Sequence, residues 1–382
     1  MTTTNDRRKF LTGMTWTAAA AMLPWEARGV PLPVAGAADA GIIINALGGL
    51  NDPNRDDGGS LVPEFSPRVL SEAHASGLTA VNITLGYVSG PDDPFEASVR
   101  DIAATDARVR AHERDLLKVL TAGDIRRAKA EKKIGLIYGF QNGAMMGKDA
   151  RRVDIFADLG VRVFQLTYNP ANPLGDGSMA PENRGLTPFG REVVARLNER
   201  RVMVDLSHSG ERTCLEAARV STAPISINHT GCRAVTDLPR NKTDAELRLV
   251  AERGGFIGIY FMPFLNASGH AKAQDVVAHI DHAVKVCGED HVGIGTDGSV
   301  SQIDNLNAYQ AELAKEIAKR KAAGISATGE RPDTYPFVVD LRGPQQFHRL
   351  AQLLAQKGYS SGRIEKILGL NFLRYAEAIW GS

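Results

Sequence analysis

The sequence predicts an α/β fold, a (β/α)8 TIM-like barrel, on three observations. Eight short apolar or β-branched runs alternate with longer stretches of helical period, which is the pattern of consecutive strand–helix units. Parallel strands need such crossover helices, and eight strands can close into a barrel. The 382 residues, 43% of them apolar, suffice for one large core. An open doubly wound sheet is the competing fold, although its phosphate-binding glycine fingerprint is absent from the sequence.

The expected elements follow one another along the chain without an internal repeat. The strand-like runs are residues 41–46, 80–85, 134–139, 161–166, 202–206, 224–227, 256–260 and 292–295. The amphipathic stretches that predict helices include residues 102–131, 188–199 and 273–287. Segments 51–60 and 169–187 are rich in Gly, Pro, Asn and Asp, which predicts long loops after the first and fourth strands. Loops of this length usually carry function.

The carboxyl-terminal part departs from the simple alternation of strand and helix. Residues 302–323 have helical spacing with many Lys and Glu, and residues 324–336 break that pattern with Gly and Pro. We interpret 302–336 as an inserted excursion near the eighth strand. Residues 341–380 return to a helical period, and we expect them to pack across the barrel. The barrel with its excursion is expected to form a single domain, residues 38–382.

The first 37 residues have the order of a twin-arginine signal peptide. An Arg-Arg pair at 7–8 precedes an apolar run at 13–23 that is too short to span a bilayer, and a small-x-small cleavage pattern stands at 35–37. We therefore expect export by the twin-arginine translocase, with a periplasmic or secreted location. No later run reaches the ~18 apolar residues that a spanning helix needs, so no membrane span is expected.

The charge balance excludes some classes of partner. Lys and Arg number 45 against 44 Asp and Glu, so no strong field draws the chain to nucleic acid or to an anionic membrane. A small-molecule or peptide substrate is the expected partner, and a homodimer stays open. The cysteines lack the spacing of a disulfide framework or a zinc ribbon, so we interpret Cys214, Cys232 and Cys287 as buried apolar residues.

Three of the strand-like runs lead into residues that carry chemistry. The fifth run continues to His208, the sixth to His229 and the eighth to Asp297. Catalytic groups of a barrel sit at the carboxyl ends of its strands, so these side chains are expected in one mouth. Histidine is the commonest metal ligand, but a single histidine is more often structural. Asp297 is interpreted as a general acid or base, with capping of a following helix as the alternative.

Five motifs occur in a specific order along almost the whole chain. They are Asp205-Leu206-Ser207-His208, Asn228-His229, Arg240-Asn241 with Asp244, Gly293-Ile294-Gly295-Thr296-Asp297, and Lys366-Ile367-Leu368-Gly369-Leu370-Asn371-Phe372-Leu373-Arg374. In these motifs the chain resembles the membrane (renal) dipeptidase family, peptidase family M19. The resemblance implies a barrel of the metal-dependent hydrolase type, with two zinc ions whose shared hydroxide attacks the amide of a dipeptide.

The resemblance assigns roles to the matching residues. His208 and His229 would be ligands of the second zinc. Asp297 would handle the proton that passes to the leaving amine. Arg240 would hold the substrate carboxylate or the tetrahedral intermediate, and Asn241 beside it is counted with the substrate-binding residues.

The positions of the first zinc depart from the family's pattern. Its His-x-Asp pair falls on Leu47 and Gly49, and the bridging glutamate falls on Gln141, a neutral amide. The histidine that polarises the substrate carbonyl falls on Tyr168, whose phenol can still donate a hydrogen bond. Two adjacent dications would repel each other without anionic ligands, so a binuclear zinc site is not expected.

The expected cofactor is therefore none, or a single divalent metal, zinc or iron. The single ion would use a partial site of His208 and His229 completed by water or Asp297. Replacement ligands from the loop after the first strand are the remaining route to two metals. These replacements are Asn51, Asp52 and Asp56.

The leading functional expectation is an exported dipeptidase-like enzyme that acts on a small peptide or an amino-acid derivative. The catalytic candidates are Asp297, Tyr168, His208 and His229. The substrate-binding candidates are Arg240, Tyr168, Gln141 and Asn241. One alternative is a metal-independent lyase, isomerase or tailoring enzyme on the same barrel. The other is a non-catalytic binding relative, against which the joint presence of the histidines, the arginine and Asp297 argues.

Overall fold

The computed structural model describes residues 41–54 and 65–382, so the expected signal peptide and part of the first long loop lie outside the described residues. Its framework is one parallel sheet with the strand order β1-β2-β4-β5-β6-β7-β8-β9. These strands are β1 (Ile44–Gly48), β2 (Ala80–Thr84), β4 (Ile134–Phe140), β5 (Val161–Gln165), β6 (Met203–Asp205), β7 (Ser226–Thr230), β8 (Phe256–Ile259) and β9 (Val292–Ile294). Each of the predicted runs overlaps one of them.

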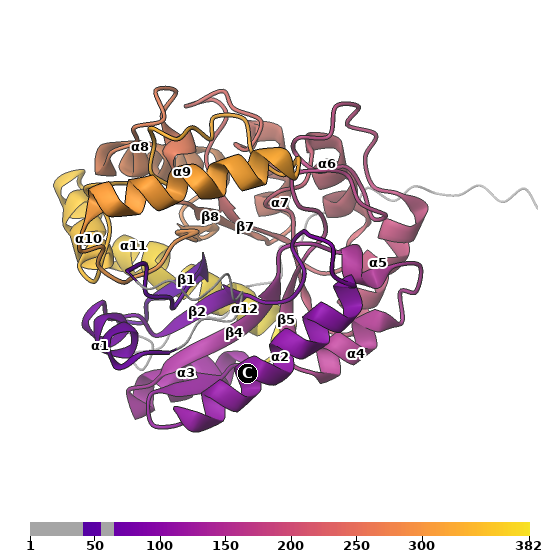
Figure 1. Ribbon diagram of the computed structural model, residues 1–382, viewed down its shortest axis with the longest axis horizontal. Helices are drawn as coiled ribbons and strands as arrows, with labels where there is room; N and C mark the ends of the chain where they lie inside the picture. Colours follow the sequence, from indigo (N-terminus) through magenta and orange to yellow (C-terminus); the bar gives the residue numbers. More distant parts are fainter. Residues whose placement is uncertain (1–40, 55–64) are drawn as a thin grey trace, which may run out of the picture.

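The two outer strands of this order meet and nearly close the sheet into a barrel. The backbone N–H of Asp297, just after β9, donates to Leu47 O of β1 at 2.9 Å. The backbone N–H of Gly49 donates to Gly298 O at 3.1 Å. Parallel strands arranged in this way, with helices outside them, form the predicted (β/α)8 barrel (Figure 1). The fold-class prediction is confirmed.

Helices surround the strands on the outside of the barrel (Figure 1). They are α1 (Pro67–Ala75), α2 (Pro94–Ala111), α3 (Ala122–Glu131), α4 (Arg152–Asp158), α5 (Pro188–Glu199), α6 (Glu211–Val220), α7 (Asp244–Glu252) and α8 (Ala273–Cys287). The predicted helices 188–199 and 273–287 coincide with α5 and α8. Proline at the first position, after an Asp, Ser or Thr whose side chain accepts a backbone N–H, begins α1, α2 and α5.

The stretch 102–131 is not one helical segment, and this prediction was wrong. α2 ends at Ala111, and a short strand, β3 (Leu116–Lys118), pairs with the start of β4 before α3 begins. Leu116 and Leu117 are buried, and buried apolar residues at these positions are compatible with a helix as well as with a strand. Hydrophobic periodicity does not distinguish a three-residue strand from a buried turn of helix.

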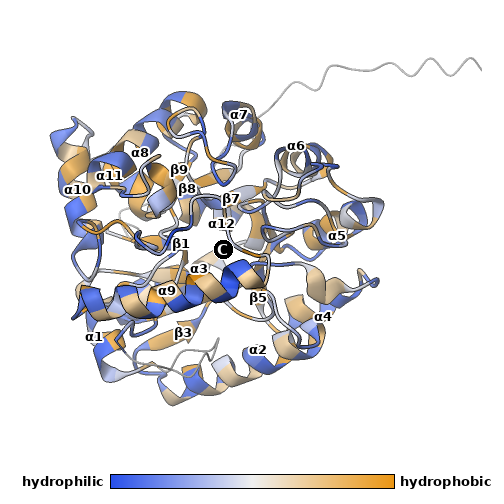
Figure 2. Ribbon diagram, turned by 45° about the horizontal axis from the view of Figure 1, so that its top comes forward, coloured by the Kyte–Doolittle hydropathy of each residue, from blue (hydrophilic) through white to orange (hydrophobic). Residues whose placement is uncertain are grey.

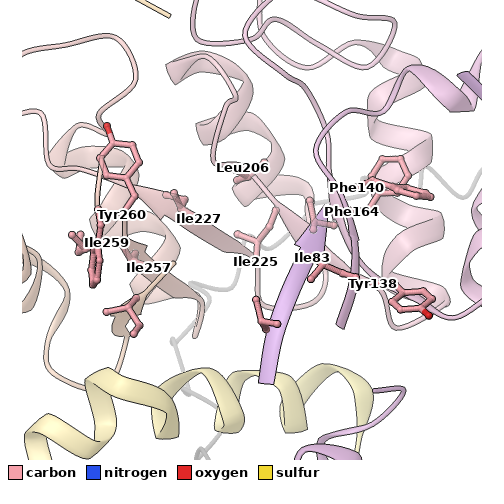
Figure 3. Packing of buried hydrophobic residues seen from close by; sticks show 14 of the residues in the cluster. Ile83, Tyr138, Phe140, Phe164, Leu206, Ile225, Ile227, Ile257, Ile259 and Tyr260 are labelled. Carbon is pink, nitrogen blue, oxygen red and sulfur yellow. The ribbon is translucent and has the colours of Figure 1, made fainter. Parts of the chain in front are cut away.

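Aliphatic and aromatic side chains from neighbouring strands pack into a continuous core. Figure 3 shows part of it, with Ile83 on β2, Phe164 on β5, Ile227 on β7 and Ile257 on β8. All of these side chains are buried. A close-packed core gives the strand ends fixed positions, and these positions determine where the polar side chains of the mouth lie.

Residues 341–380 pack against the barrel as expected. They form α10 (Gln346–Gln356), α11 (Ser361–Glu365), a π-helical turn (Lys366–Leu370) and α12 (Asn371–Trp380). Phe372 and Trp380 of α12 belong to one buried cluster with Ile42 and Ile44 at the start of β1. A Cβ on Gly369 would lie 2.3 Å from Ile42 O, so only glycine permits this close approach. The amino-terminal end of the barrel is thereby covered.

A further helix, α9 (Leu306–Ala322), lies across the opposite end of the barrel (Figure 1). It confirms the helix expected within 302–323. α9 alternates hydrophilic and hydrophobic residues along its length, and none of its residues is fully buried (Figure 2). Arg320 on α9 and Ile325 just after it both contact the loop that follows β5. Within the described ranges, no helix has the length and hydropathy of a membrane span.

Candidate active site

The candidate site is the carboxyl end of the barrel, where the loops after the strands converge. The sequence-predicted residues lie there on several different elements. Gln141 follows β4, Tyr168 follows β5, His208 follows β6, His229 lies in β7, Arg240 and Asn241 lie between β7 and α7, and Asp297 follows β9. The loop 169–187, predicted as long, contributes Asn169 to the site.

The Asp205 motif connects β6 to β7 and thereby fixes both histidines. Asp205 Oδ1 accepts hydrogen bonds from the backbone N–H of Ser207 at 3.0 Å and of Asn228 at 2.9 Å. The Ser207 hydroxyl also donates to this carboxylate, and it accepts the backbone N–H of His229 at 3.0 Å. These side chains are almost completely buried, so the network holds the two strand ends in one arrangement.

His208 and His229 face each other through their Nε2 atoms, which are 2.9 Å apart. His208 Nδ1 lies 2.7 Å from Asn169 Oδ1, and Asn169 turns its Nδ2 to Ile325 O. The Asn169 oxygen therefore accepts from His208 Nδ1–H, and His208 Nε2 accepts from His229 Nε2–H. His229 Nδ1 is left buried, without a hydrogen-bond partner in the described structure. Burial lowers the pKa of both imidazoles well below its usual value, so both rings are neutral.

Tyr168 stacks on His208 and is contacted by a cation from α9. The ring centroids are 4.4 Å apart and the planes meet at 24°. Arg320 Nη2 donates to the phenol oxygen at 3.2 Å and to Glu330 Oε1 at 2.8 Å. Because Arg320 only donates, the phenol hydrogen stays free for an acceptor in the cavity. Burial raises the pKa of Tyr168 while Arg320 opposes the rise, and the phenol remains a donor.

Arg320 and Glu330 were not among the residues predicted from the sequence. Both lie in the excursion 302–336, to which no role was assigned. Arg320 is one of several basic residues in the last turn of α9, and its neighbours in sequence extend into solvent. Only the tertiary position between Tyr168 and Glu330 distinguishes Arg320, so no local signal could have identified it.

Asp297 lies at the boundary of two cavities, one of about 500 Å³ and one of about 320 Å³. Its φ of 57° is a left-handed conformation that is rare for non-glycine residues and is often found at functional sites. Burial raises its pKa to about 6, although Arg240 and Arg320 oppose the shift. A carboxyl group with this pKa can exchange a proton near neutral pH. It does not cap the next helix, because α9 is capped by Asn305.

Arg240 is 2% exposed, and part of its guanidinium is unpartnered. Nη1 donates to Ser207 O at 2.6 Å, and Cζ lies 5.6 Å from the centre of the Tyr260 ring. Nη2 has no hydrogen-bond partner among the residues that the structure describes. A buried cationic donor without an acceptor is destabilising, and a substrate carboxylate would satisfy it.

Asn241 is placed next to Arg240, but its side chain is occupied by the protein. Nδ2 donates to Thr236 O at 2.7 Å and to Phe264 O at 3.0 Å, and Oδ1 accepts from the hydroxyl of Tyr260. All of its polar atoms therefore hold the loop that carries Arg240. The geometry gives Asn241 a positioning task, and direct substrate contact stays a prediction.

The residues that stand where the family pattern has ligands of the first zinc are neutral, and they line the two cavities. Leu47 and Gly49 lie in the wall of the larger cavity, and Gln141 lies in the wall of the smaller one. Gln141 Nε2 donates to Thr84 Oγ1 at 2.6 Å, which leaves its amide oxygen for a ligand. Gln141 thus shares the smaller cavity with Tyr168 and Asp297.

The donor set does not fit the two-zinc centre that the resemblance implies. Across residues 41–54 and 65–382, no three His, Cys, Asp or Glu side chains are placed to hold one ion. Within the described ranges, His229 Nδ1 also has no acceptor of the kind that usually orients a metal-binding histidine. Asp52 Oδ1 is engaged by the backbone N–H and Nδ2 of Asn54, and Asp56 lies outside the described residues. A partial single-ion site on the two histidines stays a prediction.

Comparisons with known proteins agree with the fold and the motifs. The family model for membrane dipeptidase (peptidase family M19) matches residues 66–327. An uncharacterized protein in the pqqA 5′ region of Klebsiella pneumoniae is 27% identical over 304 residues, 76% of this chain and 99% of that protein. The dipeptidase tcpJ of Claviceps purpurea is 30% identical over 257 residues, 66% of this chain but only 53% of that protein. The crystal structure of an amidohydrolase from Pseudomonas aeruginosa has a TM-score of 0.76 and 28% identity, covering 90% of this chain and 98% of its own.

Proposed function

Because the chain belongs to the membrane dipeptidase family (peptidase family M19), a family of dipeptidase-type hydrolases, we propose that it hydrolyses a small peptide or amino-acid derivative whose carboxylate binds Arg240. The observation that carries the proposal is the position of Asp297. It lies in the wall of both cavities, and its pKa is raised to about 6. It is the carboxyl group of this mouth that is best suited to transfer protons near neutral pH.

The proposed reaction assigns one task to each polar group. Arg240 Nη2 holds the substrate carboxylate, and Tyr168 donates its phenol hydrogen to the carbonyl oxygen of the amide. Asp297 accepts a proton from a water molecule while the water oxygen bonds to the carbonyl carbon and the carbonyl electron pair moves onto the oxygen. When the intermediate collapses, the C–N bond breaks and Asp297 returns the proton to the leaving nitrogen. Arg320 stabilises the charge that develops near Tyr168.

The histidine pair has a supporting task in this scheme. The His208 ring stacks on the Tyr168 ring, and Asn169 holds His208 in place. This stacking positions the phenol in the wall of the smaller cavity. His229 Nδ1 offers a buried lone pair for a substrate donor or for an ordered water. One divalent ion, zinc or iron, on these two histidines is the alternative use of the pair.

A second candidate function is favoured by one specific observation. Leu47, Gly49 and Gln141 supply no anionic ligand, so these three positions do not support the metal that would generate a hydroxide. A metal-independent lyase or isomerase reaction needs only the proton transfer by Asp297 and the anion binding by Arg240. Export through the twin-arginine route to the periplasm is a further part of the proposal, and the Arg-Arg pair at 7–8 supports it.

The test is elemental analysis of the protein exported from its own host, followed by cleavage assays on a dipeptide panel with and without a chelator. We expect fewer than two divalent ions per chain and cleavage that survives chelation. Two zinc ions per chain with complete loss of cleavage in chelator would overturn the proposed mechanism. Turnover of a non-amide substrate with no dipeptide cleavage would favour the lyase or isomerase candidate.

A further inference from the structure

The larger cavity of the mouth holds several buried polar groups without hydrogen-bond partners. It has a volume of about 500 Å³ and extends from Asp297 toward α2 and the segment that precedes α10. Ser301 is 4% exposed, Thr105 is completely buried, and the hydroxyl of each is unpartnered within the described residues. Arg342 also lines this cavity. Its Nε and Nη1 are buried and have no hydrogen-bond partner within the described residues.

Arg342 lacks an anionic partner in the described part of the chain. Its Cζ lies 5.9 Å from the ring centroid of Phe337. Among the residues that the structure describes, the acids that line the same cavity are Asp52 and Asp297. Asp52 is held by Asn54, and Asp297 lies at the boundary with the smaller cavity. A guanidinium that lines a cavity together with two hydroxyl groups, all unpartnered within the described residues, has the chemistry of an anion-binding site.

Much of the wall of this cavity is apolar. Its buried side chains include Leu47, Leu50, Phe65 and Ile83. Leu47 and Gly49, which stand where the family pattern has metal ligands, are part of this wall. A ligand that reaches from Asp297 to Arg342 must therefore present a short apolar segment first and an anionic group at its end.

We propose that the larger cavity is a second substrate subsite, in which Arg342, Ser301 and Thr105 bind a carboxylate carried on a short aliphatic chain. This rests on the proposed function, in which Arg240 holds the first carboxylate and the scissile amide lies at Asp297. The amino-side residue of the substrate then extends into the larger cavity. The substrate class is a dipeptide or related amide with an acidic side chain on the amino-side residue.

The test compares two dipeptides of nearly equal shape that differ by one charge, Glu-Ala and Gln-Ala. Their dissociation constants are measured by isothermal titration calorimetry on the full-length protein that carries Asp297→Asn, so that turnover does not interfere. We expect Glu-Ala to bind about 10-fold more tightly than Gln-Ala. Arg342→Gln should abolish this preference, and Ser301→Ala should reduce it about 2- to 5-fold.

The matched control is Arg349→Gln, which removes the same charge from an exposed position of α10 and should keep the preference. Arg342→Lys retains the charge and should keep part of it, which separates the charge effect from a folding defect. Equal affinities for the two dipeptides, no binding of either, or a preference that survives Arg342→Gln would each overturn the subsite. If the charge preference is present but the native protein cleaves no dipeptide, the subsite stands and the proposed hydrolysis fails.

Discussion

The two halves of the barrel mouth differ in chemistry although one sheet supports both. The ends of β1 and β4 present Leu47, Gly49 and Gln141, which are apolar or neutral. The ends of β6 and β7 and the segment after β9 present two imidazoles and a carboxyl group with a raised pKa. The difference teaches that one barrel can carry different side chains at the ends of different strands, because the buried core supports the backbone of each strand. Proton transfer and anion binding are concentrated in the second half.

The largest effect is expected from removing the carboxyl group of the second half. Asp297→Asn should lower kcat/KM by roughly 10²- to 10⁴-fold, because the amide cannot accept the proton from water. The matched control Asp92→Asn alters an exposed carboxylate and should leave kcat/KM unchanged. A loss of less than 10-fold for Asp297→Asn would remove Asp297 from the mechanism.

The same substitution has a predictable effect on stability. Because the folded pKa of Asp297 is raised to about 6, its contribution to stability is present at low pH and is lost as the pH rises through 6. At pH 7.5 we therefore expect Asp297→Asn to unfold at the same or a higher temperature, with a gain on the order of 1–3 kcal/mol.

The second prediction concerns a variant that introduces zinc-binding side chains into the neutral first half of the mouth. The triple variant Leu47→His, Gly49→Asp, Gln141→Glu should bind more zinc than the parent protein, up to about one additional ion per chain by elemental analysis. A Cβ on Gly49 would meet only the end of the Asn51 side chain, at 2.8 Å, which can move aside. The control Leu47→Asn, Gly49→Asn places polar side chains at two of the same positions without the imidazole and carboxylate groups that bind zinc. Unchanged zinc content in the triple variant would mean that these residues do not share a site.

The smallest effect concerns the cation that α9 contributes to the second half. Arg320 lowers the pKa of Asp297, so Arg320→Gln should raise that pKa. Since the base must be ionised, the acidic limb of the kcat/KM profile, expected near pH 6, should move to higher pH by less than about 1 unit. Lys315→Gln, on the exposed face of the same helix, should leave the profile in place. A shift to lower pH would contradict the assigned electrostatic role.

The sequence predicted the barrel well because its strands are buried and its strand ends carry recognisable residues. His208, His229 and Asp297 were expected in one mouth, and the structure places them at its carboxyl end. β3 was missed because its buried leucines also fit the helical period of the stretch 102–131 in which they lie.

The remaining features of the site depend on tertiary contacts. The orientation of Asn169 determines which nitrogen of His208 carries its hydrogen, and His208 in turn determines that His229 Nδ1 keeps a lone pair. A sequence does not show this orientation. The role of Arg320 depends on how α9 crosses the mouth. The hydrogen bonds of the Asn241 side chain depend on how the loop between β7 and α7 folds, because its acceptors are the carbonyl oxygens of Thr236 and Phe264. None of these contacts has a signature in spacing or composition.

The packing of α12 against the start of β1 also constrains how the chain folds. Ile42 and Ile44 are covered by Phe372 and Trp380, so two segments far apart along the chain must meet before the barrel is complete. Contacts of such high sequence separation slow folding, since a long loop must close first. A nascent chain that has not yet released α12 from the ribosome leaves β1 uncovered. The start of β1 therefore depends on a late segment of the chain for its burial, and removal of α12 is expected to lower the stability of the barrel.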